Sequence, residues 1–157
     1  MTAHDDAAFA TVVCGSRTAH SCSPDDPGPE WRGIRIRVPA RVAITPGGTE
    51  VPVCGLYTLD LLAIRKAPVL RLLALDQATG LSYGGAVIDR DASPIAPDPV
   101  ASEPSDADLE GLATSSYFNE NLLRRVRLPL KPGRYTVTVE YGEQRSNAVS
   151  VDLVVDR

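Results

Sequence analysis

The residue types that enzymes use for nucleophilic and acid–base catalysis are scarce in this chain. A serine, threonine or cysteine nucleophile needs a neighbouring base, and histidine is the usual one. The only histidines are His4 and His20, and no Gly-x-Ser-x-Gly motif occurs. Asp89, Asp91 or Glu120 could supply paired carboxylates for glycoside hydrolysis, but no spacing singles out an acid and a base. The sequence therefore predicts a protein that is not an enzyme.

Thiol and imidazole groups near the N-terminus could bind a soft metal ion. Cys14, His20 and Cys22 form a C-x5-H-x-C cluster, and zinc or copper would select such ligands. The spacing matches no standard zinc motif, so a Cys14–Cys22 disulfide and ordinary unpaired thiols are the alternatives. Cys54 falls within a predicted strand and is interpreted as a small core residue. Three cysteines are an odd set, which argues against a disulfide framework, and no cofactor is expected.

Two aspartates resemble the start of a calcium-binding loop. Asp89 and Asp91 place oxygen ligands at alternating positions, as calcium loops do. The pattern then fails, because Pro94 stands where glycine is needed and Val100 where a bidentate glutamate is needed. A solvated acidic loop is the simpler interpretation.

A long acidic and proline-rich stretch is the main candidate for contact with a partner. It covers residues 89–116 and is predicted to be a surface loop, with one short helical turn near 106–111. Loops of this length inside a compact domain are uncommon and are either functional or mobile. The predicted partner-binding residues lie in this stretch and at its end: Asp98, Glu103, Asp106, Asp108, Tyr117 and Phe118.

Arginine and aromatic side chains offer two further binding hypotheses. Arg124, Arg125 and Arg127 form a small basic patch, which either neutralises the acidic stretch or binds an anion. Trp31 and Tyr117 could present exposed rings to a carbohydrate, or they could anchor neighbouring segments to the core, where aromatic area contributes most.

Composition excludes several classes of function. The 157-residue chain carries a formal charge of −4, so it lacks the positive surface that nucleic-acid binding requires. No stretch approaches the roughly 18 apolar residues of a membrane-spanning helix. The first residues lack the basic start and apolar run of a signal peptide. A soluble, cytoplasmic protein is the default expectation, with export by another route left open.

Residues 1–30 are predicted to be an N-terminal arm, either irregular or contributing a single edge strand at 11–14. The segment contains little apolar surface to offset the entropy of ordering it, so a solvated tail is the expected form. From residue 31 onward, apolar residues recur in short runs separated by glycine and proline. The range 31–157 is therefore predicted to form one β domain.

Its first half predicts several short strands. The expected strands cover residues 34–38, 41–44, 51–61, 69–75 and 81–87, with a turn at 45–48 and a hairpin loop closed by Gly80. A helix at 59–65 is an alternative to the end of the third strand. Gly55 would let a large side chain approach its strand, and Gly84-Gly85 indicates a bulge or a close contact. The run 69–75 is almost wholly apolar, as in a strand covered on both faces or lying in mid-sheet.

The C-terminal third has the clearest alternation. Apolar residues alternate with polar ones at 126–130, 135–141 and 149–155, and the last two segments predict a hairpin with one solvated face. Pro132 and Gly133 turn the chain before the second segment.

The segment Leu130-Lys-Pro-Gly-Arg-Tyr-Thr-Val-Thr-Val139 resembles the start of the penultimate strand in immunoglobulin-like and fibronectin-like domains. The resemblance implies an antiparallel β-sandwich of about seven strands. It also implies a corner in which the Tyr135 hydroxyl bonds to backbone near Lys131. Cys54 has no partner in that strand and Trp31 precedes the first strand, so the resemblance concerns architecture alone.

These observations favour a non-catalytic protein–protein interaction module, such as an adaptor, an inhibitor or a structural subunit. Its edge strands and the 89–116 stretch would contact a protein partner. The alternative is a carbohydrate-binding or calcium-assisted adhesion domain. The oligomeric state does not follow from the sequence.

Overall fold

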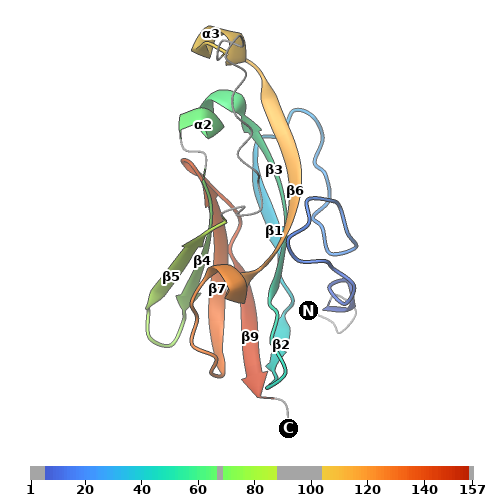
Figure 1. The fold of residues 1–157 in the computed structure, drawn as a ribbon, viewed down its shortest axis with the longest axis vertical. Helices are drawn as coiled ribbons and strands as arrows, with labels where there is room; N and C mark the ends of the chain where they lie inside the picture. Colours follow the sequence, from blue (N-terminus) through green and yellow to red (C-terminus); the bar gives the residue numbers. More distant parts are fainter. Residues whose placement is uncertain (1–5, 67–68, 88–103, 156–157) are drawn as a thin grey trace.

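Most of the regular secondary structure lies in two β-sheets, as expected. The computed structural model describes residues 6–66, 69–87 and 104–155. The first sheet is antiparallel and has the order β1-β3-β6, made of β1 (Gly33–Arg37), β3 (Pro52–Asp60) and β6 (Ala113–Asn121). Figure 1 shows this sheet beside the second one, with the N-terminal arm along its far side.

The second sheet has the order β2-β9-β7-β4-β5. Its strands are β2 (Arg41–Ile44), β4 (Leu70–Asp76), β5 (Ser82–Ala86), β7 (Gly133–Tyr141) and β9 (Val149–Val155), and the two-residue β8 (Gln144–Arg145) pairs with β7. The predicted C-terminal hairpin is therefore confirmed. The two stacked sheets are compatible with a β-sandwich.

The expectation of a purely antiparallel architecture was wrong, because β2 runs parallel to β9. Pro39 lacks the N–H that a sheet ladder requires. The chain leaves the first sheet there and joins the second, where the Asp152 N–H donates to the Ala40 carbonyl at 2.9 Å.

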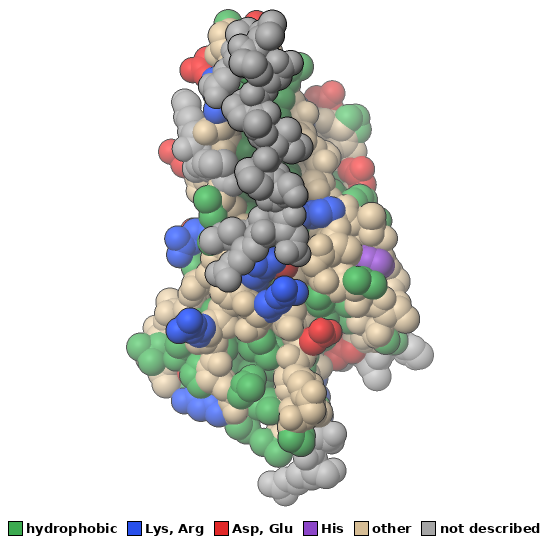
Figure 2. All heavy atoms as spheres, viewed as in Figure 1, with side chains coloured by type: hydrophobic (Ala, Val, Ile, Leu, Met, Phe, Trp, Pro, Cys, Tyr) green, Lys and Arg blue, Asp and Glu red, His purple; other side chains and the backbone are tan. Residues whose placement is uncertain are grey.

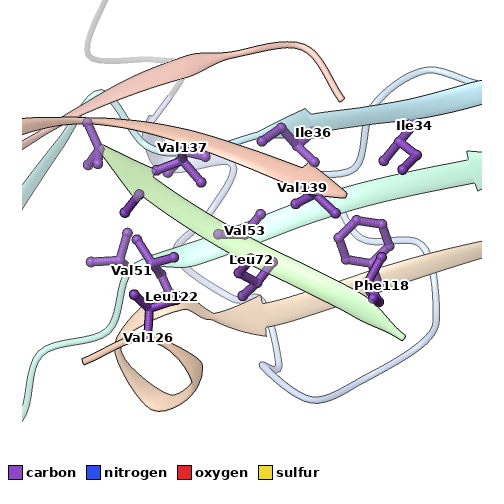
Figure 3. Packing of buried hydrophobic residues seen from close by; sticks show 14 of the residues in the cluster. Ile34, Ile36, Val51, Val53, Leu72, Phe118, Leu122, Val126, Val137 and Val139 are labelled. Atoms are coloured by element: carbon purple, nitrogen blue, oxygen red, sulfur yellow. The ribbon is translucent and has the colours of Figure 1, made fainter. Parts of the chain in front are cut away.

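One hydrophobic core lies between the sheets (Figure 3). Ile34 and Ile36 of β1 face Val137 and Val139 of β7, and all four side chains are buried. The period of two in each strand places these residues on the inner faces. Each such side chain stabilises the fold by about 1.5–3 kcal/mol on burial.

Two glycines allow close approaches, as predicted. A Cβ at Gly55 would lie 2.0 Å from Cζ of Phe118, whose ring covers this glycine from the adjacent strand. A Cβ at Gly85 would lie 1.7 Å from the carbonyl oxygen of Arg125. That residue ends the short helix α4 (Leu122–Arg125), which therefore packs directly on β5.

Strand β4 is not covered on both faces. Its residues alternate between the core and the surface, and Leu73 and Leu75 lie on the same face as Arg71. The strand does lie between two neighbours, β7 and β5. Its continuous apolar run therefore supplies both the core and part of the outer face.

Two other predictions about loops and strands were wrong. Strand β6 begins at Ala113, inside the stretch 89–116 that was interpreted as a surface loop. Residues 126–130 alternate in polarity but form no strand. Pro129 has no N–H, and the Leu128 N–H bonds locally to the Val126 carbonyl.

The Tyr135 corner is also corrected. Tyr135 is fully buried, but its hydroxyl has no hydrogen-bond partner among the described residues. The Lys131 N–H bonds to the Pro129 carbonyl, and the Tyr135 ring packs against Gly133 instead. Burial raises the Tyr135 pKa, and the neighbouring Asp76 raises it further.

Short helices complete the fold at one end of the sheets. Helix α2 (Leu61–Lys66) confirms the helical alternative after β3, and α3 (Asp106–Leu109) confirms the helical turn in the acidic stretch. Within the ranges that the structure describes, no helix has the length and apolarity that crossing a membrane requires.

Candidate protein-binding edge

The acidic residues that were predicted to contact a partner have intramolecular partners where they fall within the described ranges. Asp98 and Glu103 lie outside the described residues. Asp106 forms an ion pair with Arg65 at 3.4 Å. Asp108 accepts a hydrogen bond from the Ser105 backbone, which lowers its pKa, and the two residues form a capping box at the start of α3. Asp106 and Asp108 therefore stabilise the α3 turn.

Tyr117 and Phe118 lie on opposite faces of β6. Phe118 is fully buried in the core, so it is not available to a partner. Tyr117 is half-buried on the outer face, opposite Leu56. The structure does not bring these two side chains together into one binding surface.

The carbohydrate hypothesis depends on Trp31 and Tyr117. The guanidinium of Arg35 lies over the Trp31 ring, 5.4 Å from its centroid. Arg35 pairs with Leu56, and Leu56 pairs with Tyr117, so Arg35 and Tyr117 share the outer face of the first sheet. Trp31 is packed against its own chain, and its ring is half-buried.

The cysteine predictions were wrong in two respects. Cys22 forms a disulfide with Cys54, and Cys14 is the free cysteine. Cys54 is buried on the outer face of β3 rather than in the main core, because its neighbours Val53 and Gly55 face inward. The alternation in the sequence already indicated that Cys54 points outward, since Val53 and Tyr57 define the inner face.

The proposed metal cluster does not form. The Cys22 sulfur is bonded to Cys54, and Nε2 of His20 lies 3.2 Å from Oγ of Ser16. Burial raises the pKa of the Cys14 thiol to about 11, with further contributions from Glu50 and Glu120. Among the described residues, no three histidine, cysteine or carboxylate side chains converge on a metal site. His4, Asp89 and Asp91 lie outside those residues.

The arginine patch is divided. Nε of Arg125 lies 3.2 Å from the buried Glu120 carboxylate, so its charge is neutralised from β6. Arg124 and Arg127 are exposed. The ion pair between the buried Glu120 carboxylate and Arg125 is part of the fold rather than a binding site. The sequence had predicted instead that the acidic stretch would neutralise these arginines.

A cleft of about 620 Å³ lies at the helical end of the molecule. Leu62, Ala63 and Leu109 form its apolar part, and Asp60, Glu110 and Glu143 are among its acidic residues. Asp60 is paired with Arg32 at 3.1 Å.

The outer edge of β6 is partly occupied by the N-terminal arm. The Asn119 N–H donates to the Ser16 carbonyl at 3.0 Å, and the Gly15 N–H donates to the Asn119 carbonyl at 2.5 Å. The Asn119 side chain donates to Thr18 and Ser16 as well. The described part of the arm is therefore packed on the sheet and is not a solvated tail: Phe9 and Cys22 are buried in a small cluster with Cys54. The outward groups of Ala113 and Ser115 have no backbone partner among the described residues.

The outer edge of β1 is closed at one point by a side chain. The Asn147 amide accepts from the Ile36 N–H at 2.8 Å and donates to the Ile36 carbonyl at 3.1 Å. It thus makes the two bonds that a neighbouring strand would make, and it links the first sheet to the chain before β9.

Strand β5 presents a different edge. The Asp76 N–H bonds to the Leu81 carbonyl and the Val87 N–H bonds to the Leu70 carbonyl, so residues 81, 83, 85 and 87 point their backbone groups at β4. By the alternation of an antiparallel ladder, Ser82, Gly84 and Ala86 point theirs away. Within the described part of the chain, no hydrogen bond reaches those outward groups. Figure 1 shows β5 as the outermost strand on its side.

The surface beside this edge is hollowed and combines apolar with charged side chains, because Arg71, Glu140 and Arg145 line the same groove as Leu73 and Leu75. A groove of about 470 Å³ runs over the outer face, where Leu73 and Leu75 lie between Ser82 and Thr136. Leu75 is 39% exposed and Leu81 is 57% exposed. Figure 2 shows hydrophobic side chains with Lys or Arg side chains among them where Figure 1 places the β4–β5 hairpin.

Residues 81–87 contain no charged residue and no proline. Natural proteins usually protect a sheet edge with one of these features, or cover it. The edge is therefore chemically equipped to accept another strand, and the lack of charge in this segment was visible in the sequence. Comparison with known proteins adds no assignment: no family model, no curated protein and no solved structure matches the chain.

Proposed function

We propose that this chain is a non-catalytic protein-interaction module that binds its partner by strand addition at the outer edge of β5. The observation that carries the proposal is the run of outward backbone groups at Ser82, Gly84 and Ala86, none of which has a partner among the described residues. An extended segment of another protein would bond to these groups.

The physical basis is the backbone and the adjoining groove. Three outward residues can exchange several hydrogen bonds with an added strand, each worth about 0.5–1.5 kcal/mol net. Small side chains at these three positions leave the edge accessible. Side chains of the added strand would cover Leu75, which is otherwise exposed.

We further propose that the framework is immunoglobulin-like. In such domains strands A, B and E share one sheet, and G, F and C share the other, which variable-type domains extend by C′. The order β1-β3-β6 facing β9-β7-β4-β5 supports this correspondence, with β5 as C′. The disulfide departs from the pattern, because it joins β3 to the arm rather than to β7.

The Cys22–Cys54 disulfide favours an oxidising compartment over the cytoplasm that was the default expectation. Such bonds persist in oxidising surroundings and are rare in reducing ones. Thiol alkylation of the protein isolated from its host, followed by mass spectrometry, tests this: protection of Cys22 and Cys54 supports it, and three alkylated cysteines contradict it.

Site-specific photocrosslinking in the native host tests the binding edge. A photoreactive residue at position 82 should crosslink to the partner segment that pairs with the β5 backbone, whereas one at position 115 on β6 should not crosslink. Ser82→Pro, which removes an outward N–H without touching the ladder to β4, should abolish crosslinking from a photoreactive residue placed at position 86. A complex that forms equally well with Ser82→Pro, or that crosslinks only through position 115, contradicts the proposal.

A further inference from the structure

Resting on the proposed strand addition at β5, we infer that the bound segment of the partner is acidic at one defined position. Its aspartate or glutamate would face Gly84 on the outer face of the sheet and bond to the guanidinium of Arg71. An apolar side chain two residues away, facing Ser82, would cover the exposed part of Leu75.

Arg71 belongs to β4, but its guanidinium lies over the edge strand. Arg71 pairs with Ala86, and Leu73 pairs with Gly84, in the register of β4 with β5. A Cβ at Gly84 would lie 3.3 Å from Nη2 of Arg71 and 3.1 Å from Cδ2 of Leu73. Both side chains therefore use the space that glycine leaves open. The arginine charge is thereby carried onto the strand that a partner segment would meet.

The Arg71 charge is not neutralised within the described part of the chain. Its cross-strand neighbour on β7 is Glu140, but that carboxylate accepts a hydrogen bond from Nε of Arg145 at 3.0 Å. Among the described residues, no hydrogen bond or ion pair reaches the Arg71 guanidinium, and the residue is exposed. The charged residues that line the groove are these three, so the groove carries one excess positive charge.

A carboxylate facing Gly84 is well placed to bond to this guanidinium. Residues directly opposite on adjacent strands have Cβ atoms about 5 Å apart, and opposite charges at such positions stabilise the pairing. Guanidinium and carboxylate groups form charge-assisted bonds, often two in parallel. Gly84 is the central one of the three outward residues, so this position lies beside Arg71 whether the added strand runs parallel or antiparallel to β5.

The same charge argues against a second copy of β5 as the bound strand. Residues 81–87 contain no acidic residue. Antiparallel pairing of two copies about Gly84 would also bring their Arg71 guanidinium groups together, and like charges destabilise a strand pair. The occupant that fits the edge is therefore an extended segment of a different protein.

Selection from a phage-displayed library of random linear nonapeptides tests the inference with a defined probe. The full chain is used as wild type, Arg71→Glu and Arg41→Gln. The wild type should enrich peptides with an aspartate or glutamate two positions from an apolar residue. Arg71→Glu should enrich lysine or arginine at that position instead. Arg41 is an exposed arginine on β2, at the other edge of the same sheet, so Arg41→Gln should select like the wild type.

Fluorescence anisotropy of an enriched peptide then measures the ion pair. Replacing its acidic residue by the corresponding amide should weaken binding to the wild type by about threefold to tenfold. The same replacement should have little effect on binding to Arg71→Gln. The difference should shrink at about 1 M salt, where charges are screened beyond about 3 Å. The peptide change leaves the protein intact, so it provides the test if an Arg71 variant does not fold.

Ser82→Pro separates this inference from the proposed function, with Ala86→Pro as a second variant that removes an outward N–H. Enriched peptides that lose binding to both variants but show no acidic preference overturn the acidic partner and leave strand addition standing. The same holds for peptides that keep their acidic preference with Arg71→Glu. Peptides that bind both proline variants as well as the wild type, or a wild type that enriches no peptide, contradict the inference and the proposed function together.

Discussion

The two long sides of the molecule treat their sheet edges in opposite ways. On the first sheet, the arm bonds to β6 through Asn119, and Asn147 bonds to β1 through Ile36. On the second sheet, β5 offers its outward groups at Ser82, Gly84 and Ala86 with no such partner in the described residues. Internal contacts therefore satisfy part of one side, whereas the described residues leave the outward backbone groups of β5 unpaired.

The difference lies in where the irregular segments of the chain pack. The arm contributes little to the main core, yet a disulfide and a buried asparagine hold it against β6 and β3. At β5, helix α4 packs on the inner side of Gly85 and leaves the edge itself uncovered. Breaking the arm should therefore destabilise the fold, whereas changing the β5 edge should affect association alone.

The largest effect is expected on removing the disulfide. Cys22 and Cys54 are 32 residues apart, and a cross-link over a loop of that length stabilises by about 3–4 kcal/mol in the chain-entropy account. The double variant Cys22→Ala/Cys54→Ala should lose about that much in urea denaturation. Cys14→Ser is the matched control and should unfold like the wild type. A double variant as stable as that control would mean that the arm is not fastened by this bond.

Asn119→Ala should have the next largest effect. The side chain is buried and donates to the Thr18 carbonyl at 2.8 Å and to Oγ of Ser16 at 3.0 Å. Losing both bonds should cost about 2 kcal/mol, and amide exchange of the arm should accelerate more than that of β7. Asn121→Ala offers a comparison on the same strand, since its amide bonds to Val51 and caps α4 rather than holding the arm.

Asn147→Ala should cost less, about 1 kcal/mol, because Ile36 loses two hydrogen bonds but its backbone can then meet water. The Ile36 amide should lose exchange protection, while the β7–β9 pairing persists. An unchanged Ile36 exchange rate would show that the side chain does not close this edge.

Ser82→Lys should have the smallest effect on stability, within about 0.5 kcal/mol for an exposed substitution away from the core. Thermal unfolding of the monomer should therefore match the wild type. A loss comparable to that of Asn119→Ala would mean that β5 is held by contacts beyond its pairing with β4.

Much of the fold could be predicted because the core strands obey a period of two. The alternation at 135–141 and 149–155 directly reflects one buried face, and Gly55 was identifiable as the site of a close approach. Strand β6 could not be found this way, because Ser115 and Ser116 supply no apolar alternation and only Phe118 is a large buried hydrophobic residue. Its strand conformation follows from pairing with β3, which is a tertiary effect.

The packing of the arm and the proposed binding edge could not be predicted from the sequence, for related reasons. The Cys22–Cys54 bond joins segments whose proximity depends on the sheet, and no local pattern reports it. The stretch 89–116 was predicted to contact a partner because its acidic residues can be identified from the sequence alone. The β5 edge is defined by the absence of charge and by which backbone groups point outward, and the second property requires the register with β4.

Residue-resolved amide hydrogen exchange tests the contrast between the edges most directly. In dilute protein, the amides of Ser82, Gly84 and Ala86 should exchange much faster than those of Tyr83, Gly85 and Val87. They should also exchange faster than the arm-bonded amide of Asn119. Protection of all three in dilute protein would contradict an edge that is open within the chain.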